Sequence, residues 1–192
     1  MVTWTGSEVS RLVTQVTRYV VAGLMEDVFA ETTVEGPAGE REGITAAQFE
    51  VLRYIDRHER PTVKELATGL GISSAAATKA VNGLADDRAM PLVRRARGSD
   101  RRTVRLATTA AGHELVRLVR ERFTAQLDEV AQRMSEADRE ALVLGLRGFL
   151  QAAIQDLADC DAACLRCGID HRENCVVQLA EMALTGAAST RC

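Results

Sequence analysis

Apolar residues recur at steps of three and four along most of this chain, which is the spacing of helices that bury one face. The first such run covers Ser7–Thr33 and predicts one long amphipathic helix. The next segment, Glu35–Gly43, contains three glycines and one proline, which predicts a flexible surface loop. A second helix is predicted over Thr45–His58, because the Thr45 hydroxyl can cap its first turn and Pro61 lies just beyond its end.

Two short helices joined by a glycine-containing turn are predicted next, over residues 61–86. Leu66 and Ala67 face inward in the first helix, and Ser73 caps the second, which turns Ala77 and Val81 toward the core. The opposite face of the second helix carries small and polar side chains: Ser74, Ala75, Thr78, Lys79 and Asn82. This pattern predicts a helix-turn-helix whose second helix can enter the major groove of DNA, because no bulky side chain blocks the approach.

The segments Met90–Ala96 and Arg102–Ala107 alternate between apolar and charged positions on either side of Gly98–Asp100. Alternation around a glycine-containing tip predicts a two-stranded wing with its arginines on the exposed side. These arginines form a local anion-binding face on a chain whose net charge is −3. The candidate DNA contacts in this region are Arg94, Arg95, Arg97, Arg101 and Arg102.

Two further helical stripes run from Leu115 to Met134 and from Leu142 to Leu157, and Ser135 with Asp138 marks the start of the second. Together with the first helix they exceed what one winged helix needs for its own core, so they predict a dimerisation layer. The expected fold is mainly α with a small β-wing: a winged helix-turn-helix plus a helical dimerisation layer.

Composition narrows the classes of function. No apolar run approaches the roughly 20 residues of a membrane span and the N-terminus lacks a signal pattern, so we expect a cytoplasmic protein with no membrane partner. No Ser–His–Asp set, phosphate-cradling glycine loop or paired carboxylate stands out, and we do not expect an enzyme. His58 and His113 are isolated in the sequence and are interpreted as ordinary surface or helix-end histidines.

Three stretches carry a resemblance to a known family: Thr45–Leu52, Ile72–Ser74, and Asp100–Arg102 followed by Leu106, Thr109 and Gly112. They are similar to the corresponding stretches of the multiple-antibiotic-resistance regulator (MarR) family of winged-helix transcription factors, and the resemblance covers roughly residues 7–158. It implies a homodimer that binds a pseudo-palindromic operator in double-stranded DNA, with Ser73, Ser74, Thr78, Lys79 and Asn82 facing the major groove. It also implies that Arg101 or Arg102 reaches the minor groove and that Asp100 orients the wing arginine.

All five cysteines lie between Cys160 and Cys192. The first four have the spacing Cys160-x3-Cys164-x2-Cys167-x7-Cys175. If the last helix continues, the first three lie on one face, since steps of four and seven residues return to nearly the same direction. We therefore expect a cysteine module at the C-terminus, with Gly168 permitting a turn toward Cys175.

Four thiolates in a short segment predict an iron–sulfur cluster, of the 4Fe–4S or 2Fe–2S type, at Cys160, Cys164, Cys167 and Cys175. Zinc is the alternative, because Cys164-x2-Cys167 is a familiar half-site and His171 can join it. A third possibility is a set of metal-free thiols that switch by forming a disulfide. Cys192 is expected to lie outside the site.

The sequence thus divides into a helix and loop (1–44), a winged helix-turn-helix (45–112), dimerisation helices (113–158) and a cysteine-rich extension (159–192). The leading hypothesis is a dimeric repressor whose DNA binding is controlled by an iron–sulfur cluster that senses redox state, nitric oxide or iron. One alternative is control by a small phenolic or aromatic ligand, with a structural zinc site. Another is a metal-dependent enzyme or electron carrier on a winged-helix scaffold.

Overall fold

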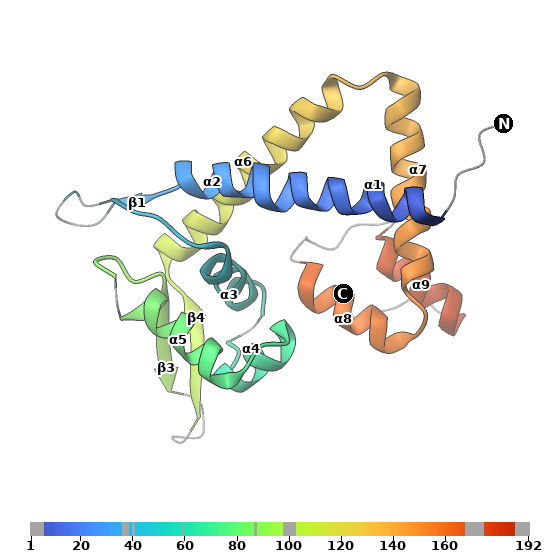
Figure 1. The fold of residues 1–192 in the computed structure, drawn as a ribbon. Helices are drawn as coiled ribbons and strands as arrows, with labels where there is room; N and C mark the ends of the chain where they lie inside the picture. The colour runs from blue at the N-terminus through green and yellow to red at the C-terminus, as the bar shows by residue number, and fades with distance from the viewer. Residues whose placement is uncertain are drawn as a thin grey trace.

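The computed structural model of the chain describes residues 6–35, 39, 41–58, 60–86, 88–97, 103–167 and 175–186. In chain order the helical elements are α1 (Gly6–Arg18), the π-helical segment η1 (Tyr19–Leu24), α2 (Met25–Glu31), α3 (Ala46–Arg57), α4 (Val63–Leu70), α5 (Ser74–Ala85), α6 (Ala110–Gln132), α7 (Glu136–Ala153), α8 (Leu157–Cys167) and α9 (Val176–Thr185). The strands are β1 (Val34–Glu35), β2 (Arg41–Glu42), β3 (Val93–Arg97) and β4 (Val104–Thr108). Figure 1 shows long helices above, the winged helix below them on one side, and α8 with α9 below them on the other.

The first predicted helix is confirmed as one helical run, α1–η1–α2, which ends at Glu31 rather than at Thr33. The backbone stays in the right-handed helical region at Arg18 and Met25, so the π-helical segment joins the two α-helices without a break. Arg122 of α6 holds the far end, since its Nη1 donates to the Glu31 carbonyl at 2.5 Å and to Thr32 Oγ1 at 2.8 Å. This fixes α2 against α6.

The hydrophobic core lies where α3 meets the helix-turn-helix, the wing and the start of α6. Five leucines at most 1% exposed come from five different elements: Leu52, Leu66, Leu84, Leu106 and Leu115. The inward faces predicted for the helix-turn-helix are confirmed, because Ala67, Ala77 and Val81 are also buried. One core therefore sets the positions of α3, α4, α5, β4 and α6 together.

The predicted wing is confirmed, with shorter strands than the alternation suggested. Strand β3 pairs antiparallel with β4, so that Val93 lies opposite Thr108 and Arg97 opposite Val104. The hairpin is anchored at the middle of β4, where the Leu106 amide donates to the Pro61 carbonyl at 2.8 Å. The wing is thereby attached to the segment that leads into α4.

Helix α6 starts in close contact with the wing. The Thr109 amide donates to the Leu92 carbonyl at 3.0 Å, and the Thr109 hydroxyl caps the helix by accepting from the Gly112 amide at 3.1 Å. A Cβ on Gly112 would stand only 2.2 Å from the Leu92 carbonyl oxygen. Glycine is therefore required for this approach of helix to wing.

The predicted flexible loop over Glu35–Gly43 is held at its base. Its described ends form a short antiparallel pair, in which Val34 lies opposite Glu42. Arg88 donates to the carbonyls of Glu42 and Gly43, and its Nε lies 3.1 Å from a Glu42 carboxylate oxygen. The Arg88 side chain is 6% exposed, so this end of the loop is fixed to the segment after α5.

The end predicted for the last helix is wrong. Helix α7 begins after the Ser135 cap as expected, but it stops at Ala153, and the backbone at Ile154 is extended (φ −93°, ψ 109°). A new helix follows because the Asp156 carboxylate accepts from the Asp159 amide at 2.9 Å and so caps α8. The boundary expected at residues 158 and 159 therefore falls inside α8, and the break lies a few residues earlier.

Helices α1 and α7 expose apolar stripes, as expected of a dimerisation layer. Within α7 no described residue is buried. Its exposed large apolar side chains are Leu142, Val143, Leu144, Leu146, Phe149 and Leu150. Among the residues that the structure describes, no helix has both the length and the apolar character that crossing a lipid bilayer requires.

Candidate nucleic-acid interface

A capping box sets the start of helix α4. The Thr62 hydroxyl accepts from the Glu65 amide at 3.2 Å, and the Glu65 carboxylate accepts from the Thr62 amide at 2.6 Å. These bonds lower the pKa of Glu65, the Thr62 amide contributing most, followed by the Thr62 hydroxyl and then by the charge of Arg105. The helix ends at Gly71, whose φ of 65° lies in the left-handed region that glycine adopts freely.

Helix α5 begins at the predicted cap, because the Ser73 hydroxyl accepts from the Ala76 amide at 3.1 Å. Its residues Ala77, Val81 and Leu84 are buried in the core. The opposite face lines a shallow hollow of about 530 Å³ formed by Ser74, Ala75, Thr78, Lys79 and Asn82. The structure thus brings together on one exposed surface the groove-facing residues that the sequence predicted, and Ser73 serves as the cap beside them.

The wing arginines have different surroundings. Arg94 is exposed and lies opposite Ala107 in the hairpin. Arg95 instead turns toward α5, where its Nη1 lies 2.7 Å from both carboxylate oxygens of Asp86 and its Nη2 donates to Asn82 Oδ1 at 2.6 Å. Arg95 is exposed, as predicted, but its contact with α5 was not expected, because alternation sets which residues share a face and not what that face contacts.

The remaining wing predictions fall outside the part of the chain that the structure describes. These are Asp100, Arg101, Arg102 and the side chain of Arg97. Their assignment to DNA contacts stays a prediction. Arg105, which the sequence did not single out as a DNA contact, donates to the Arg60 carbonyl at 3.1 Å and lies 3.4 Å from the Glu65 carboxylate.

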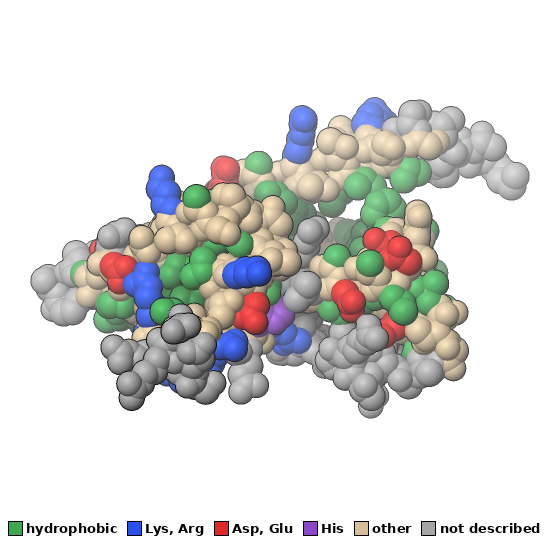
Figure 2. Space-filling model, turned by 90° about the horizontal axis from the view of Figure 1, so that it is seen from below, with side chains coloured by type: hydrophobic (Ala, Val, Ile, Leu, Met, Phe, Trp, Pro, Cys, Tyr) green, Lys and Arg blue, Asp and Glu red, His purple; other side chains and the backbone are tan. Residues whose placement is uncertain are grey.

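Figure 2 views the molecule from below, toward the side that holds the wing and the helix-turn-helix. Both basic and acidic side chains lie over the winged helix, and acidic side chains lie over the C-terminal helices beside it. The acidic charge over the C-terminal helices disfavours the approach of an anionic polymer to that part of this face.

Cys160, Cys164 and Cys167 lie on α8, and Cys175 immediately precedes α9, a helix that packs against α8. Cys160 is 3% exposed, while Cys164 and Cys175 are half-buried. Cys175 is the N-cap residue of α9, and Cys167 ends α8 with a side chain outside the described residues. His171 and Cys192 also lie outside them.

Acidic groups surround the buried thiol. Burial raises the pKa of Cys160, and the nearby charges of Glu181, Asp161, Asp159 and Asp156 raise it further. Glu181 of α9 is itself 7% exposed. Within the described residues, no three His, Cys, Asp or Glu side chains converge as a metal site. Sequence spacing did not indicate that Glu181 lies near Cys160, because Glu181 belongs to a different helix, α9.

Helix α8 also contacts α4, the first helix of the helix-turn-helix. Figure 1 shows α8 beside α4 and below α1, while α9 packs against α7. The sequence led us to expect the cysteines on a continuation of the last dimerisation helix. After the break at Ile154 the chain instead turns back, and α8 contacts the helix-turn-helix at α4.

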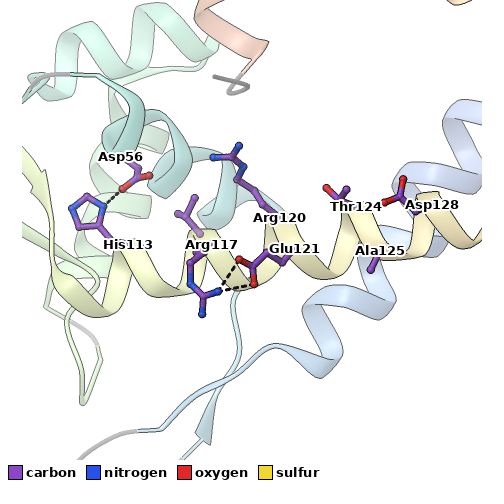
Figure 3. A pocket seen from close by; sticks show the side chains of 9 residues that line it. Asp56, His113, Arg117, Arg120, Glu121, Thr124, Ala125 and Asp128 are labelled. Atoms are coloured by element: carbon purple, nitrogen blue, oxygen red, sulfur yellow. Dashed lines mark hydrogen bonds and ion pairs between the residues drawn. The ribbon is translucent and has the colours of Figure 1, made fainter. Parts of the chain in front are cut away.

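A second hollow of about 510 Å³ lies between the end of α3 and α6. Figure 3 shows Asp56 in contact with His113 at one end, and Arg120, Thr124 and Asp128 along the rest. Arg117 in its wall bonds to Glu121 at 2.6 Å and to Glu114 at 2.5 Å. His113 is therefore not the isolated histidine that the sequence suggested; its partner Asp56 belongs to another helix.

Comparison with known proteins agrees with this architecture. Residues 42–103 match a family model described as the MarR family. Similar solved structures include RV1404 from Mycobacterium tuberculosis, at 24% identity and a TM-score of 0.67, with 81% of this chain and 99% of that chain covered. A MarR family protein from Bacillus stearothermophilus is similar at 21% identity and a TM-score of 0.58, with coverage of 78% and 98%.

A third structure contains DNA. It is FabT from Streptococcus pneumoniae in complex with DNA, at 20% identity and a TM-score of 0.56, with 74% of this chain and 95% of that chain covered. No curated protein matches this chain. The resemblance to MarR winged helices, drawn from the sequence, is confirmed by the family match and by the fold.

Proposed function

We propose that this chain, whose winged helix is that of the MarR family, is a homodimeric transcriptional regulator that binds a pseudo-palindromic operator in double-stranded DNA. The observation that carries the proposal is the exposed face of α5. It combines a capped helix end, small polar side chains and Lys79, and it lies beside an arginine-bearing hairpin. A helix of this form enters the major groove, while the hairpin contacts the neighbouring backbone or minor groove.

The exposed apolar stripes of α1 and α7 support the dimer. Val9, Leu12 and Val16 are each more than 40% exposed in the single chain, as are Leu146 and Leu150. A contiguous apolar surface of this kind is rare on a monomer and is buried by association. Two copies would place two α5 helices about one DNA turn, or roughly 34 Å, apart.

Binding of the full-length chain to a library of genomic fragments tests this function. The expected result is enrichment of fragments that share an inverted repeat. If no fragment is enriched and the protein is shown to be folded and dimeric, the winged helix does not bind a specific DNA sequence. That result would favour the enzyme or electron-carrier alternative.

We further propose that the thiols of α8 and α9 bind a metal centre, an iron–sulfur cluster or zinc, that controls operator affinity. The donors would be Cys160, Cys164, Cys167 and Cys175, whose thiolates are ligands that both iron–sulfur clusters and zinc take. A metal held between these thiols would stabilise the packing of α8 on α9. Because α8 also contacts α4, we expect a metal at these thiols to change the affinity for DNA.

The direction of this control follows from packing. A centre that joins the thiols of α8 and α9 would order α8, which contacts α4, and would hold the first helix of the helix-turn-helix in place. We therefore expect the metal-bound protein to bind its operator more tightly, so that loss or oxidation of the centre releases DNA.

Metal and acid-labile sulfide analysis of anaerobically purified protein distinguishes the forms. Iron with equimolar sulfide and a visible charge-transfer band supports a cluster, and zinc without sulfide supports the structural-metal alternative. A protein without either metal, whose thiols all react as free groups, would contradict the metal proposal and would leave the disulfide switch.

A second candidate signal is a small phenolic or aromatic ligand in the hollow between α3 and α6. The lining combines Val116 and Ala125 with charged side chains of both signs, among them Arg120 and Glu121, which suits an aromatic ring that can both donate and accept hydrogen bonds. A thermal-shift screen of such compounds against the wild-type protein and Arg120→Ala tests this candidate. A compound that raises the melting temperature of the wild type alone and releases operator DNA would support it; equal shifts in both proteins would place the compound elsewhere.

A further inference from the structure

Asn82 occupies an unusual position on the reading helix, because a wing residue already engages its side chain. It lies on α5 in the same hollow as Thr78 and Lys79. Its Oδ1 accepts a hydrogen bond of 2.6 Å from Arg95 Nη2. Arg95 is held in turn by Asp86, one turn beyond Asn82, at 2.7 Å. The last turn of α5 and strand β3 are thus joined through one guanidinium group.

The chemistry of this contact fixes the orientation of the amide. A guanidinium group has five N–H donors and no acceptor, so only the oxygen of the Asn82 amide can face it. The NH2 group of Asn82 is left on the side away from Arg95 and remains available to donate.

An asparagine that can rotate reads adenine, because its oxygen accepts from adenine N6 while its NH2 group donates to N7. On Asn82 the bond from Arg95 occupies the oxygen and brings a positive charge beside it. The base edge that best matches a donating NH2 group next to a cation has only acceptors. Guanine presents such an edge in the major groove, with N7 and O6 side by side.

We propose that Arg95 is a positioning residue that makes Asn82 selective for guanine in the operator. This inference rests on the proposed function and names the base that Asn82 of α5 recognises. Arg95 acts through Asn82 and through the anchor that Asp86 provides, so its effect is on base preference and not only on overall affinity.

Selection of operator sites from randomised DNA by the full-length protein and two variants tests the proposal. The wild-type protein should select guanine at one position of each half-site, and replacement of that base by 7-deazaguanine should weaken binding. With Arg95→Ala, Asn82 is free to rotate, and the guanine preference over adenine at that position should fall by about tenfold. Asn82→Asp, which presents acceptors only, should shift the preference toward cytosine, whose N4 donates.

Arg94→Ala is the matched control, because Arg94 is the neighbouring exposed arginine and its strand position faces away from α5. Its loss should weaken binding to all sequences alike and leave the base preference unchanged. If Arg95→Ala behaves in the same way, with melting temperature retained, Arg95 is only a source of charge and the proposal is overturned. If the wild-type protein selects no sequence at all, it is the proposed function that fails.

Discussion

Gly69 of α4 lies directly against the ring of Tyr54 of α3. A Cβ on Gly69 would stand 2.3 Å from Tyr54 Cε2 and 2.4 Å from its hydroxyl oxygen. That hydroxyl donates to the Glu65 carbonyl at 3.2 Å, so the same ring also bonds to α4. Helix α4, the first helix of the helix-turn-helix, is therefore packed against α3 with no room for a Cβ at position 69.

Gly69→Ala tests this contact. In an ordinary helix the change stabilises by up to about 1 kcal/mol. Here we expect the free energy of unfolding to fall by about 1–3 kcal/mol, because the Tyr54 ring must move and lose its hydrogen bond. Urea unfolding measures it, with Thr68→Ala as the exposed neighbouring control, expected to lie within about 0.5 kcal/mol of the wild type. An increase in stability on Gly69→Ala would show that the helices are further apart.

The capping box of α4 should make stability depend on pH. Because the pKa of Glu65 is lowered, its ionised form is favoured in the folded state. That contribution is fully present above the ordinary glutamate pKa of about 4.3 and is lost as the pH falls through the lowered folded value. Melting curves of the wild type and Glu65→Ala should differ at pH 7 and converge in acid. Thr62→Ala keeps the backbone amide that bonds to Glu65, so its difference from the wild type should change less with pH. A difference between the wild type and Glu65→Ala that stays constant into acid would exclude an ionised cap.

The apolar stripe of α7 should hold the dimer together. Leu146→Glu combined with Leu150→Glu places two charges on one face of the helix, and we expect monomers in sedimentation velocity together with loss of operator binding. Leu144→Glu is the control, since Leu144 is 70% exposed and points to the opposite side of the helix. A dimer that survives the double substitution would place the interface elsewhere.

Arg94 and Arg105 should differ in their contribution to DNA affinity. Arg94 is exposed on the hairpin, whereas Arg105 bonds to the Arg60 carbonyl and lies near Glu65. Each phosphate contact contributes about 0.9 to the slope of log affinity against log salt concentration. Arg94→Ala should therefore reduce the slope by about one, and Arg105→Ala should leave it nearly unchanged while lowering the melting temperature. If both substitutions changed the salt slope equally, the two arginines would not differ in their contact with phosphates.

The sequence predicted the winged helix well, because its signals are local. Thr45, Ser73 and Ser135 were each expected at a helix start, and each accepts a backbone hydrogen bond there. The break between α7 and α8 was missed because the apolar stripe continues to Leu157, whereas the cap that ends the pattern is a single aspartate, Asp156.

Contacts between distant segments were less accessible from the sequence. Nothing in the local pattern indicates that Arg95 reaches Asn82, that His113 meets Asp56, or that α8 returns to α4. These contacts depend on how whole elements pack. They are also where the proposed specificity and control lie.

The thiols of α8 and α9 are proposed to set the affinity of the winged helix for DNA. The most direct measurement is operator affinity by fluorescence anisotropy, under anaerobic conditions, for the protein as purified and after metal removal by a chelator. The variant with Cys160, Cys164, Cys167 and Cys175 all replaced by serine serves as the reference, and Cys192→Ser as the matched control. We expect the chelator to weaken binding by at least about fivefold in the wild type and Cys192→Ser, and to have no effect on the reference variant. Equal affinities for all of these proteins, with and without chelator, would contradict the account.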